Sequence, residues 1–373
     1  MTSLFALALV VAVAQEDVPL VFERVKISDT KFEAACACDI DNDGHMDIVS
    51  GEFWWAGPDF KTRHQFCKVQ PQGEYYDDFS DYPLDINGDG YVDIVTGGYW
   101  GKELLWRENP KGKPGMWQNH RIGPAGSIER TCFYDLDGDG HVEIIPNETA
   151  SLTIYKLLRD DQGRGTGKFE HYVLRGSAQG HGLGFGDLNH DGRVDIILHD
   201  GWYEQPAEGL GGTWAWHRDF ELGSASVPIV THDVNGDGLN DMLVGQAHAY
   251  GLDWWEQKQD GTWEKHEIDP HRSQYHDMIL EDIDNDGELE LITGKRYRAH
   301  NGNDPGADDP VGVYYFDIDG GAFKRVTLDY GPPDKASGLG IFGWVCDVDG
   351  NGWKDIVAPG KEGLYLFKNM GRP

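Results

Sequence analysis

The nine residues Asp39-Ile-Asp-Asn-Asp-Gly-His-Met-Asp47 decide the fold of this 373-residue chain, because six close copies follow them. The shared pattern is Asp-x-Asp/Asn-x-Asp/Asn-Gly-x-x-Asp/Glu, and its copies begin at Asp39, Asp85, Asp135, Asp187, Asp233, Asp282 and Asp347. Successive copies start 46, 50, 52, 46, 49 and 65 residues apart. Self-similarity with a period of about 40–50 residues is typical of the blades of a β-propeller.

Each copy places oxygen-bearing side chains at alternating positions, with a glycine that permits a sharp turn. Because Ca²⁺ takes about 6–8 oxygen ligands, the pattern predicts a calcium loop. An EF-hand would need glutamate at position twelve, where the first three copies have Ser50, Thr96 and Pro146. Strand-like β-branched runs follow the motif, so each loop should be a hairpin turn in which calcium has a structural role. The predicted calcium ligands are Asp39, Asp41, Asp43, Asp47, Asp85, Asn87, Asp89, Asp93, Asp135, Asp137, Asp139, Glu143, Asp187, Asn189, Asp191, Asp195, Asp233, Asn235, Asp237, Asp241, Asp282, Asp284, Asp286, Glu290, Asp347, Asp349, Asn351 and Asp355.

The two ends of the chain indicate how the ring closes. Segments such as Trp117–Ile122 and Phe323–Leu328 have the look of outer, fourth strands, and Phe22–Ile27 shares it although it precedes the first motif. After the seventh motif only Leu364–Phe367 remains as a strand candidate. The N-terminal strand should therefore complete the last blade and remove an exposed sheet edge. We predict an all-β fold, a single seven-bladed β-propeller over residues 20–373.

The charge composition argues against one class of partner, nucleic acid. The formal net charge is -32, and seven bound Ca²⁺ ions would bring it to about -18. Such acidity argues against nucleic acid, which selects basic surfaces. The five cysteines do not form a disulfide framework pattern, and an odd number leaves at least one thiol free. Cys38 and Cys346 stand before the first and last motifs and are candidates for a bridge, but buried free thiols are the preferred interpretation.

The N-terminus predicts export from the cytoplasm. Leu4–Ala14 is an apolar run that ends in small residues, as in a secretory signal peptide, which we place at residues 1–14. The run is too short for a comfortable membrane span, and no other segment of the sequence is a candidate to cross a bilayer. Calcium loops also suit a secreted or periplasmic protein, because calcium is plentiful outside the cytoplasm.

The face opposite the motifs is the expected working face. On this face the chain enters each inner strand at the residue six positions before the motif. It leaves each second strand on the same face, at the residue five positions after the motif. Among these and their neighbours are Glu33, Asp78, Glu129, Arg130, His181, Tyr275, His276, Glu52, Trp100, Glu148, Tyr250, Lys295 and Arg296. Clustered titratable groups at a concave ring mouth are the default active-site hypothesis. The sixth repeat carries an insertion, residues 299–310, which should act as a lid with His300 and Asn301 directed at the pocket.

The motifs resemble the FG-GAP/VCBS repeats of integrin-type propellers. Four further segments, Glu74–Phe79, Gly180–Gly182, Gln274–Asp277 and Gly294–Gly306, resemble the bacterial single-propeller relatives of aldos-2-ulose dehydratase. This resemblance implies a metal-dependent enzyme that eliminates water from keto-sugars such as 1,5-anhydrofructose. The fungal enzymes carry further domains, including a cupin, that have no counterpart in this sequence, so an isomerase step of those domains is not expected here.

Elimination beside a carbonyl needs a base, a positive site for the enolate and an acid for the leaving group. His181 and His276 are the candidate ligands of Zn²⁺ or Mg²⁺, or else acid/base groups, and Tyr275 is the candidate second proton carrier. Arg130, Lys295 and Arg296 would stabilise the enolate, and His300 completes the catalytic candidates. Glu33 and Glu129 would complete a metal site or bind sugar hydroxyls. The remaining candidates for substrate binding are Glu52, Asp78, Trp100, Tyr250 and Asn301.

Other functions remain open at this stage. Seven-bladed polysaccharide lyases, such as those acting on ulvan or rhamnose-glucuronate polymers, share the fold and the elimination chemistry. A non-catalytic propeller that binds carbohydrate or protein should have a flatter mouth with fewer histidines. Glycoside hydrolysis would need two carboxylates about 5–10 Å apart, for which Glu33, Glu129 and Glu148 are the candidates. The expected partner is a small sugar or an oligosaccharide.

Overall fold

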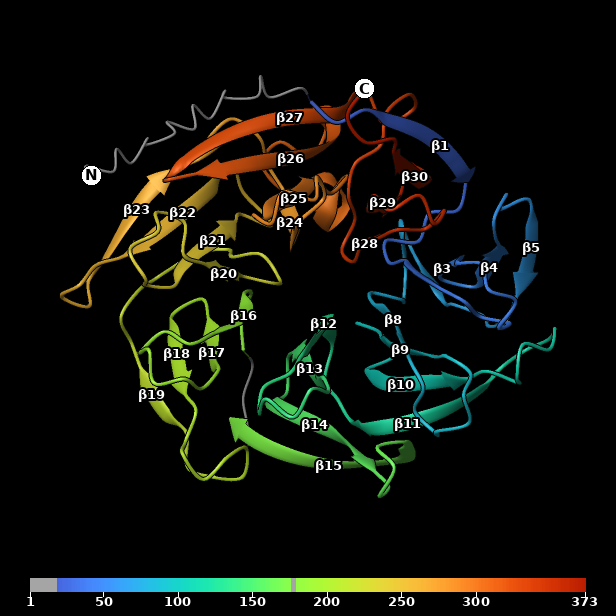
Figure 1. The fold of residues 1–373 in the computed structure, drawn as a ribbon, viewed down its shortest axis with the longest axis horizontal. Helices are drawn as coiled ribbons and strands as arrows, with labels where there is room; N and C mark the ends of the chain where they lie inside the picture. The colour runs from blue at the N-terminus through green and yellow to red at the C-terminus, as the bar shows by residue number, and fades with distance from the viewer. Residues whose placement is uncertain (1–18, 176–178) are drawn as a thin grey trace, which may run out of the picture.

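The computed structural model describes residues 19–175 and 179–373 as a ring of seven four-stranded antiparallel sheets (Figure 1). The blades follow one another around the ring in chain order, and their innermost strands surround the central axis. Within the described residues there is no α-helix, only one 3-10 turn, η1 (Ala299–Gly302). The predicted seven-bladed propeller is therefore confirmed. The proposed signal peptide, residues 1–14, lies outside the described residues.

The strands are grouped by blade from the axis outward. Blade 1 has β2 (Cys36–Cys38), β3 (Asp47–Ser50), β4 (Phe53–Ala56) and β5 (Thr62–Gln65), and a short hairpin of β6 (Pro71–Gln72) and β7 (Tyr75–Tyr76) follows it. Blade 2 has β8 (Asp81–Leu84), β9 (Asp93–Gly97), β10 (Glu103–Glu108) and β11 (Gln118–Pro124). Blade 3 has β12 (Ile128–Tyr134), β13 (Glu143–Glu148), β14 (Leu152–Arg159) and β15 (Gly165–Arg175).

The remaining blades repeat this order. Blade 4 has β16 (Leu183–Gly186), β17 (Asp195–Leu198), β18 (Gly201–Glu204) and β19 (Ala215–His217). Blade 5 has β20 (Val230–His232), β21 (Asp241–Gly245), β22 (Leu252–Gln257) and β23 (Trp263–Glu267). Blade 6 has β24 (Tyr275–Glu281), β25 (Glu290–Lys295), β26 (Val311–Asp319) and β27 (Ala322–Gly331). Blade 7 has β28 (Trp344–Cys346), β29 (Asp355–Gly360), β30 (Gly363–Asn369) and β1 (Phe22–Ser28).

The first strand of the chain closes the ring. Strand β1 pairs antiparallel with β30, from Phe22 opposite Asn369 to Ser28 opposite Leu364. The last blade would otherwise expose the edge of β30, and an unpaired edge is a template for aggregation. The predicted closure by the N-terminal strand is therefore present, and both ends of the described chain lie beside the same blade (Figure 1).

Each acidic motif is the hairpin between the first and second strands of its blade, as predicted. In the first copy, Asp39 accepts hydrogen bonds from the N–H groups of Asp43 (3.1 Å) and Gly44 (2.9 Å). The last residue of the motif begins the second strand, where Asp47 accepts the Ile40 N–H at 2.8 Å and the Gly57 N–H at 2.8 Å. Position nine therefore has a structural role of its own, tying the hairpin to its blade with or without an ion.

The open end of the hairpin retains the oxygens that a cation would need. Carboxylate oxygens of Asp39, Asp41 and Asp43 lie within 4.8 Å of one another. Asp41 Oδ1 is buried, and no described residue provides it with a hydrogen-bond partner. A buried carboxylate oxygen without a donor is costly, and a bound Ca²⁺ would satisfy it. These residues fit the calcium prediction, which stays a prediction.

Many aromatic residues stabilise the blades themselves. In four blades a tryptophan of the third strand stacks on the histidine opposite it in the fourth strand: Trp54 on His64 (4.1 Å between ring centroids), Trp106 on His120 (4.4 Å), Trp202 on His217 (4.2 Å) and Trp254 on His266 (4.4 Å). Cross-strand aromatic pairs of this kind are a recurrent unit of sheet stability. These tryptophans and histidines are therefore part of the scaffold.

The cysteines also belong to the scaffold. All five are free, and four of them are buried. Cys38 and Cys346 form no bridge, in agreement with the interpretation as small apolar residues of the inner strands. No helix among the described residues is long and apolar enough to span a membrane.

Candidate metal centre and substrate pocket

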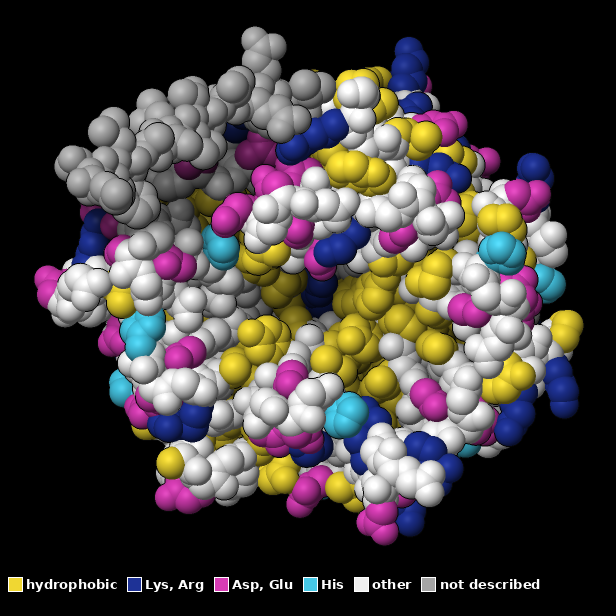
Figure 2. Space-filling view, in the orientation of Figure 1, with side chains coloured by type: hydrophobic (Ala, Val, Ile, Leu, Met, Phe, Trp, Pro, Cys, Tyr) yellow, Lys and Arg dark blue, Asp and Glu magenta, His cyan; other side chains and the backbone are white. Residues whose placement is uncertain are grey.

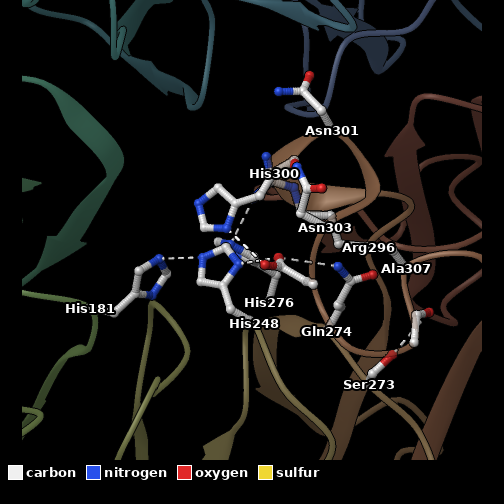
Figure 3. A network of polar contacts seen from close by, with 12 residues as sticks. His181, His248, Ser273, Gln274, His276, Arg296, His300, Asn301, Asn303 and Ala307 are labelled. Carbon is white, nitrogen blue, oxygen red and sulfur yellow. Dashed lines mark hydrogen bonds and ion pairs between the residues drawn. The ribbon is translucent and has the colours of Figure 1, made fainter.

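Four metal-ligating side chains converge on the face opposite the motif hairpins. Glu129 comes from β12, His276 comes from β24, and His181 and His248 lie in the segments just before β16 and just after β21. They belong to four successive blades, numbers 3 to 6. Strand direction explains the convergence, because each first strand starts, and each second strand ends, on this face. Figure 3 shows the three imidazoles turned toward one another.

The distances fit one cation. His181 Nε2 lies 2.8 Å from His248 Nε2, and His276 Nε2 lies 3.3 Å from Glu129 Oε1. One ligand atom from each of the four residues lies within 4.8 Å of the other three. Ligands at about 2.0–2.2 Å from a zinc ion would be separated by distances of this order. The four residues thus form a candidate metal centre.

The tautomers of two histidines explain why these rings face each other. The Nδ1 of His181 lies 3.0 Å from the Ala225 carbonyl, which accepts only, so this nitrogen carries the proton. The Nδ1 of His248 lies 2.7 Å from Asp304 Oδ2, so it also donates. In the neutral rings both Nε2 atoms are then bare lone pairs, 2.8 Å apart. Two facing lone pairs repel unless a cation lies between them, and oriented imidazoles of this kind are a hallmark of metal sites.

The third histidine is oriented by a guanidinium. Arg296 Nη1 lies 2.8 Å from His276 Nε2 and donates to it, which leaves the Nδ1 of this buried ring without a partner among the described residues. Burial lowers the pKa of His276 well below its usual value, and the Arg296 charge adds to this effect. Burial, together with nearby His181, lowers the pKa of His248 to about 4. Both rings are therefore neutral at neutral pH, but only the Nε2 lone pair of His248 is bare, because that of His276 accepts from Arg296 and would bind an ion only after Arg296 moved aside.

The carboxylate of the centre is ionised. Burial alone would raise the pKa of Glu129, but the neighbouring imidazoles and Arg296 hold it well below the usual range. Arg296 is itself buried, and its Nε donates to Glu33 Oε1 at 2.8 Å. Lys361 Nζ donates to the same Glu33 oxygen at 2.9 Å. Glu33 is therefore a support for Arg296 behind the pocket and does not line it.

A cavity of about 390 Å³ opens beside the four ligands. One wall is aromatic, and Trp100 is 39% exposed there. The lining residues are Tyr75, Phe79, Tyr99, Trp100, Ser127, Glu129, Asn147, Glu148, Thr149, Gly180, His181, Arg296, His300 and Asn301. Aromatic faces combined with a few placed polar groups are typical of small-ligand pockets.

The insertion 299–310 contributes the rim of this pocket. His300 stacks on His248 with ring centroids 4.1 Å apart, and the N–H of Asn301 donates to the Tyr75 hydroxyl at 2.9 Å. Asp304 accepts from His248 through Oδ2 (2.7 Å) and from His300 Nδ1 through Oδ1 (2.9 Å). One carboxylate of the insertion thus fixes a candidate metal ligand and a pocket histidine together. The expectation that His300 and Asn301 face the pocket holds.

Residues 85–145 and 233–293 match the model of the FG-GAP-like repeat. No curated protein matches the chain. Among solved structures, a lectin of Agrocybe aegerita, described by its recognition of non-reducing terminal N-acetylglucosamine, is similar to it with a TM-score of 0.48. The identity is 18%, and the likeness covers 83% of this chain and 81% of the lectin.

Two residues predicted to be catalytic, Tyr275 and Lys295, lie on the sheet face of blade 6 that points away from the pocket. Tyr275 precedes His276 in β24, and adjacent strand residues point to opposite sheet faces. Its ring is fully buried among apolar side chains, and its hydroxyl donates to Asp269 at 3.0 Å. Lys295 likewise precedes Arg296, and its Nζ donates to Gln274 Oε1 at 2.6 Å beneath the insertion. Neither side chain lines the pocket.

Arg130 is also displaced from its predicted role. It follows Glu129 in β12, so the same alternation turns it away from the metal centre. Its guanidinium forms a buried ion pair with Asp277 and donates to the carbonyls of Val227 (2.9 Å) and Ile341 (2.6 Å). Because these partners occupy it, Arg130 cannot stabilise an enolate in the pocket.

Three residues expected to bind substrate are engaged elsewhere. Asp78 is fully buried and accepts a hydrogen bond from Thr96 Oγ1 at 2.8 Å beside Arg107. Glu52 accepts the Val69 N–H at 3.0 Å in blade 1. The Tyr250 hydroxyl donates to Asp309 Oδ2 at 2.6 Å at the outer edge of the insertion. None of the three lines the pocket.

The principal functional residues missed by sequence reasoning are His248 and Asp304. His248 lies two positions beyond the strand-exit position Gln246, in a segment whose course periodicity does not fix. Asp304 is one of four aspartates between residues 304 and 317, and sequence alone cannot single it out. Both become recognisable only through the contact between them, at 2.7 Å.

Proposed function

We propose that this protein is a metal-dependent carbon–oxygen lyase that performs β-elimination on a keto-sugar such as 1,5-anhydrofructose or an aldos-2-ulose. The observation that carries the proposal is the convergence of three imidazole Nε2 atoms and the Glu129 carboxylate beside an aromatic-walled cavity of about 390 Å³. A ring mouth that served only as packing would not need two neutral imidazoles, His181 and His248, whose bare Nε2 lone pairs face each other. The resemblance to aldos-2-ulose dehydratases suggested the substrate class.

The donor set favours zinc over magnesium. Imidazole nitrogens suit Zn²⁺ and related transition metals, whereas Mg²⁺ prefers oxygen ligands and retains its waters. His181, His248, His276 and Glu129 would hold the ion, with Asp304 and the Ala225 carbonyl orienting two of the imidazoles. When bound, the ion would supply a Lewis acid that polarises the sugar carbonyl.

His300 is the residue best placed to move the proton. Its Nδ1 is held by Asp304 at 2.9 Å, so its Nε2 is free to act as a base at the pocket rim. It would take the proton from the carbon beside the carbonyl, and the electrons of that C–H bond would become the enolate. As the enolate collapses to a C=C bond, the C–O bond one carbon further breaks. The imidazolium then returns its proton to the departing hydroxyl, which leaves as water.

The charges of the pocket favour an uncharged sugar. Arg296 is the only Lys or Arg side chain among the lining residues. Its charge is already shared by Glu33 and Glu129, at 2.8 Å and 3.4 Å. A uronate would need a free cation to balance its carboxylate. A neutral keto-sugar therefore suits the pocket better than the uronate polymers of polysaccharide lyases.

The test is to incubate the purified, zinc-loaded protein with keto-sugars and, separately, with uronate polymers, while ultraviolet absorbance reports the new conjugated enone. We expect enone only from keto-sugars, and its loss in the His248→Ala variant and on removal of zinc. Absorbance from an unsaturated uronate, formed from the uronate polymers alone, would assign the protein to the polysaccharide lyases. Saccharide binding without enone would assign it to the binding propellers, because the exposed Trp100 is able to stack on a sugar in either case.

A further inference from the structure

A second cavity lies at the other end of the central axis. It measures about 520 Å³ and is lined by inner-strand residues of blades 2 to 7. Figure 2 shows a hollow at the centre of the ring, walled mainly by hydrophobic side chains, with a Lys or Arg side chain inside it. We call this cavity the axial funnel and define it by Tyr82, Phe133, Phe185, Val230, Ile279 and Trp344. The proposed lyase chemistry makes no use of it.

The upper wall of the axial funnel is aromatic and only half-buried. Tyr82 stacks on Phe133 with ring centroids 3.8 Å apart, and Trp344 meets Tyr82 edge-on at 5.6 Å. These three rings come from three different blades, and all three are partly exposed to solvent. Val230 and Ile279 continue the apolar wall and are also half-buried. A concave apolar surface left in contact with water favours a ligand that covers it.

The Arg130–Asp277 ion pair lies at the inner end of the funnel. Arg130 is the only Lys or Arg side chain that lines the cavity, and it is 6% exposed. Its charge is balanced by Asp277, and its guanidinium lies over the Phe342 ring, 4.7 Å from the centroid. Its Nε is buried with no partner among the described residues. This nitrogen has no accessible surface, so a ligand in the cavity would meet other atoms of the Arg130 side chain.

The mouth of the funnel excludes anions. Glu281 lies at the rim, and the seven acidic hairpins open on the same face. Carboxylates around a cavity of low polarity repel negative ligands. The recess is also a deep pit whose shape suits a small molecule, whereas protein partners usually dock on broader and flatter surfaces. Together these features describe the chemistry of an occupant.

We propose that the axial funnel binds a small, uncharged, mainly apolar molecule that contains a ring and carries one hydrogen-bond acceptor directed at Arg130. The aromatic and aliphatic walls would take up the body of the ligand. Its acceptor would meet the part of the Arg130 side chain that lines the cavity. This site is separate from the metal centre, because the two cavities share no lining residue among those that the structure describes.

The test uses N-phenylnaphthylamine, an uncharged aromatic probe that fluoresces in apolar surroundings, with the calcium-loaded protein. We expect saturable binding at one site. Val230→Arg, which places a charge in the half-buried wall, should weaken binding by at least about tenfold. The matched control is Val173→Arg on the outer strand of blade 3, where the side chain is 59% exposed, and it should bind the probe as the unaltered protein does.

Several outcomes would overturn the proposal. Absence of saturable binding, or equal binding by the two variants when both unfold at the same temperature as the unaltered protein, would mean that the probe adsorbs elsewhere. Tighter binding of the anionic anilinonaphthalene sulfonate would contradict the uncharged class of ligand. A dimer in sedimentation velocity that Val230→Arg abolishes would assign the funnel to a second copy of the chain. If the unaltered protein forms enone, Val230→Arg should form it at the same rate. If it forms none, the binding test of the funnel still stands by itself.

Discussion

On one face of the ring, seven hairpins repeat a single acidic motif in register, whereas the four groups that converge on the opposite face come from four blades and share no pattern. The same inner strands build both faces. Repetition on the hairpin face means that each blade fulfils the same local need, a turn whose buried oxygens have partners. Divergence on the pocket face means that the residues there are free of that need. A ring of similar blades can therefore keep one face for stability and vary the other for chemistry.

The difference between the faces is most sharply tested by removing calcium while zinc is kept. Each hairpin that holds Ca²⁺ at a free concentration 100 times its Kd should contribute about 2.7 kcal/mol to stability, so calcium depletion should lower the unfolding temperature strongly. Differential scanning calorimetry at fixed zinc measures the shift. An unfolding temperature that does not depend on calcium would show that the hairpins are held by their own hydrogen bonds alone.

On the pocket face, the loss of a ligand should affect turnover and leave the fold intact. His276→Ala removes one of the four converging groups and should reduce both zinc content and enone formation by more than about 100-fold, since loss of a mere supporting partner already costs about 10–100-fold. Metal analysis and enone assays on the same preparation measure the two losses. His64→Ala, which removes a scaffold histidine, is the matched control and should retain zinc. Full turnover by His276→Ala would refute the metal centre.

Asp304 tests whether the insertion belongs to the metal centre. Asp304→Asn keeps the size of the side chain but weakens the acceptor that orients His248 and His300, so zinc affinity should fall by about 10–100-fold. The control is Asp308→Asn in the same insertion, where the side chain is 80% exposed and lies near Arg298 only. Zinc titration by calorimetry separates the two variants. Equal zinc affinities would mean that the insertion lines the pocket but does not support the zinc ligands.

Glu362, in the turn between β29 and β30, tests the cost of burying a carboxylate outside the acidic hairpins. Burial raises its pKa to about 7, and only its Oε1 has a partner, the Gly338 N–H. The folded state therefore binds a proton more tightly than the unfolded state, so stability falls as pH rises from the usual glutamate pKa to about 7. Glu362→Gln should remove this slope and gain about 1–2 kcal/mol at and above neutral pH. Urea unfolding across this pH range measures it, and a slope as steep in the variant as in the unaltered protein would contradict the assignment.

The comparison of the faces also explains what could be predicted from the sequence. The motif fixes strand direction, blade number and ring closure, because all of these follow from a local pattern and its period. Register counting from the motif placed Glu129, His181, His276 and Arg296 at the ring mouth, since they lie within six residues of the pattern. It could not separate His276 from Tyr275, or Arg296 from Lys295, because the sheet face of a residue changes with each step along a strand. Bulges in β12 and β24 near the pocket make this count still less certain.

The pair Tyr275 and His276 turns that argument into an experiment with a small expected effect. Tyr275 donates to Asp269 inside blade 6, so Tyr275→Phe should lower the free energy of unfolding by about 1 kcal/mol through the lost hydrogen bond. Turnover should change by less than about twofold, because the hydroxyl does not reach the pocket, whereas the neighbouring His276→Ala should abolish turnover. Urea unfolding and enone assays on the two variants measure both quantities. If Tyr275→Phe instead lost turnover with its stability intact, the hydroxyl would have to reach the substrate, and the sheet-face alternation that separates the two residues would not hold during catalysis.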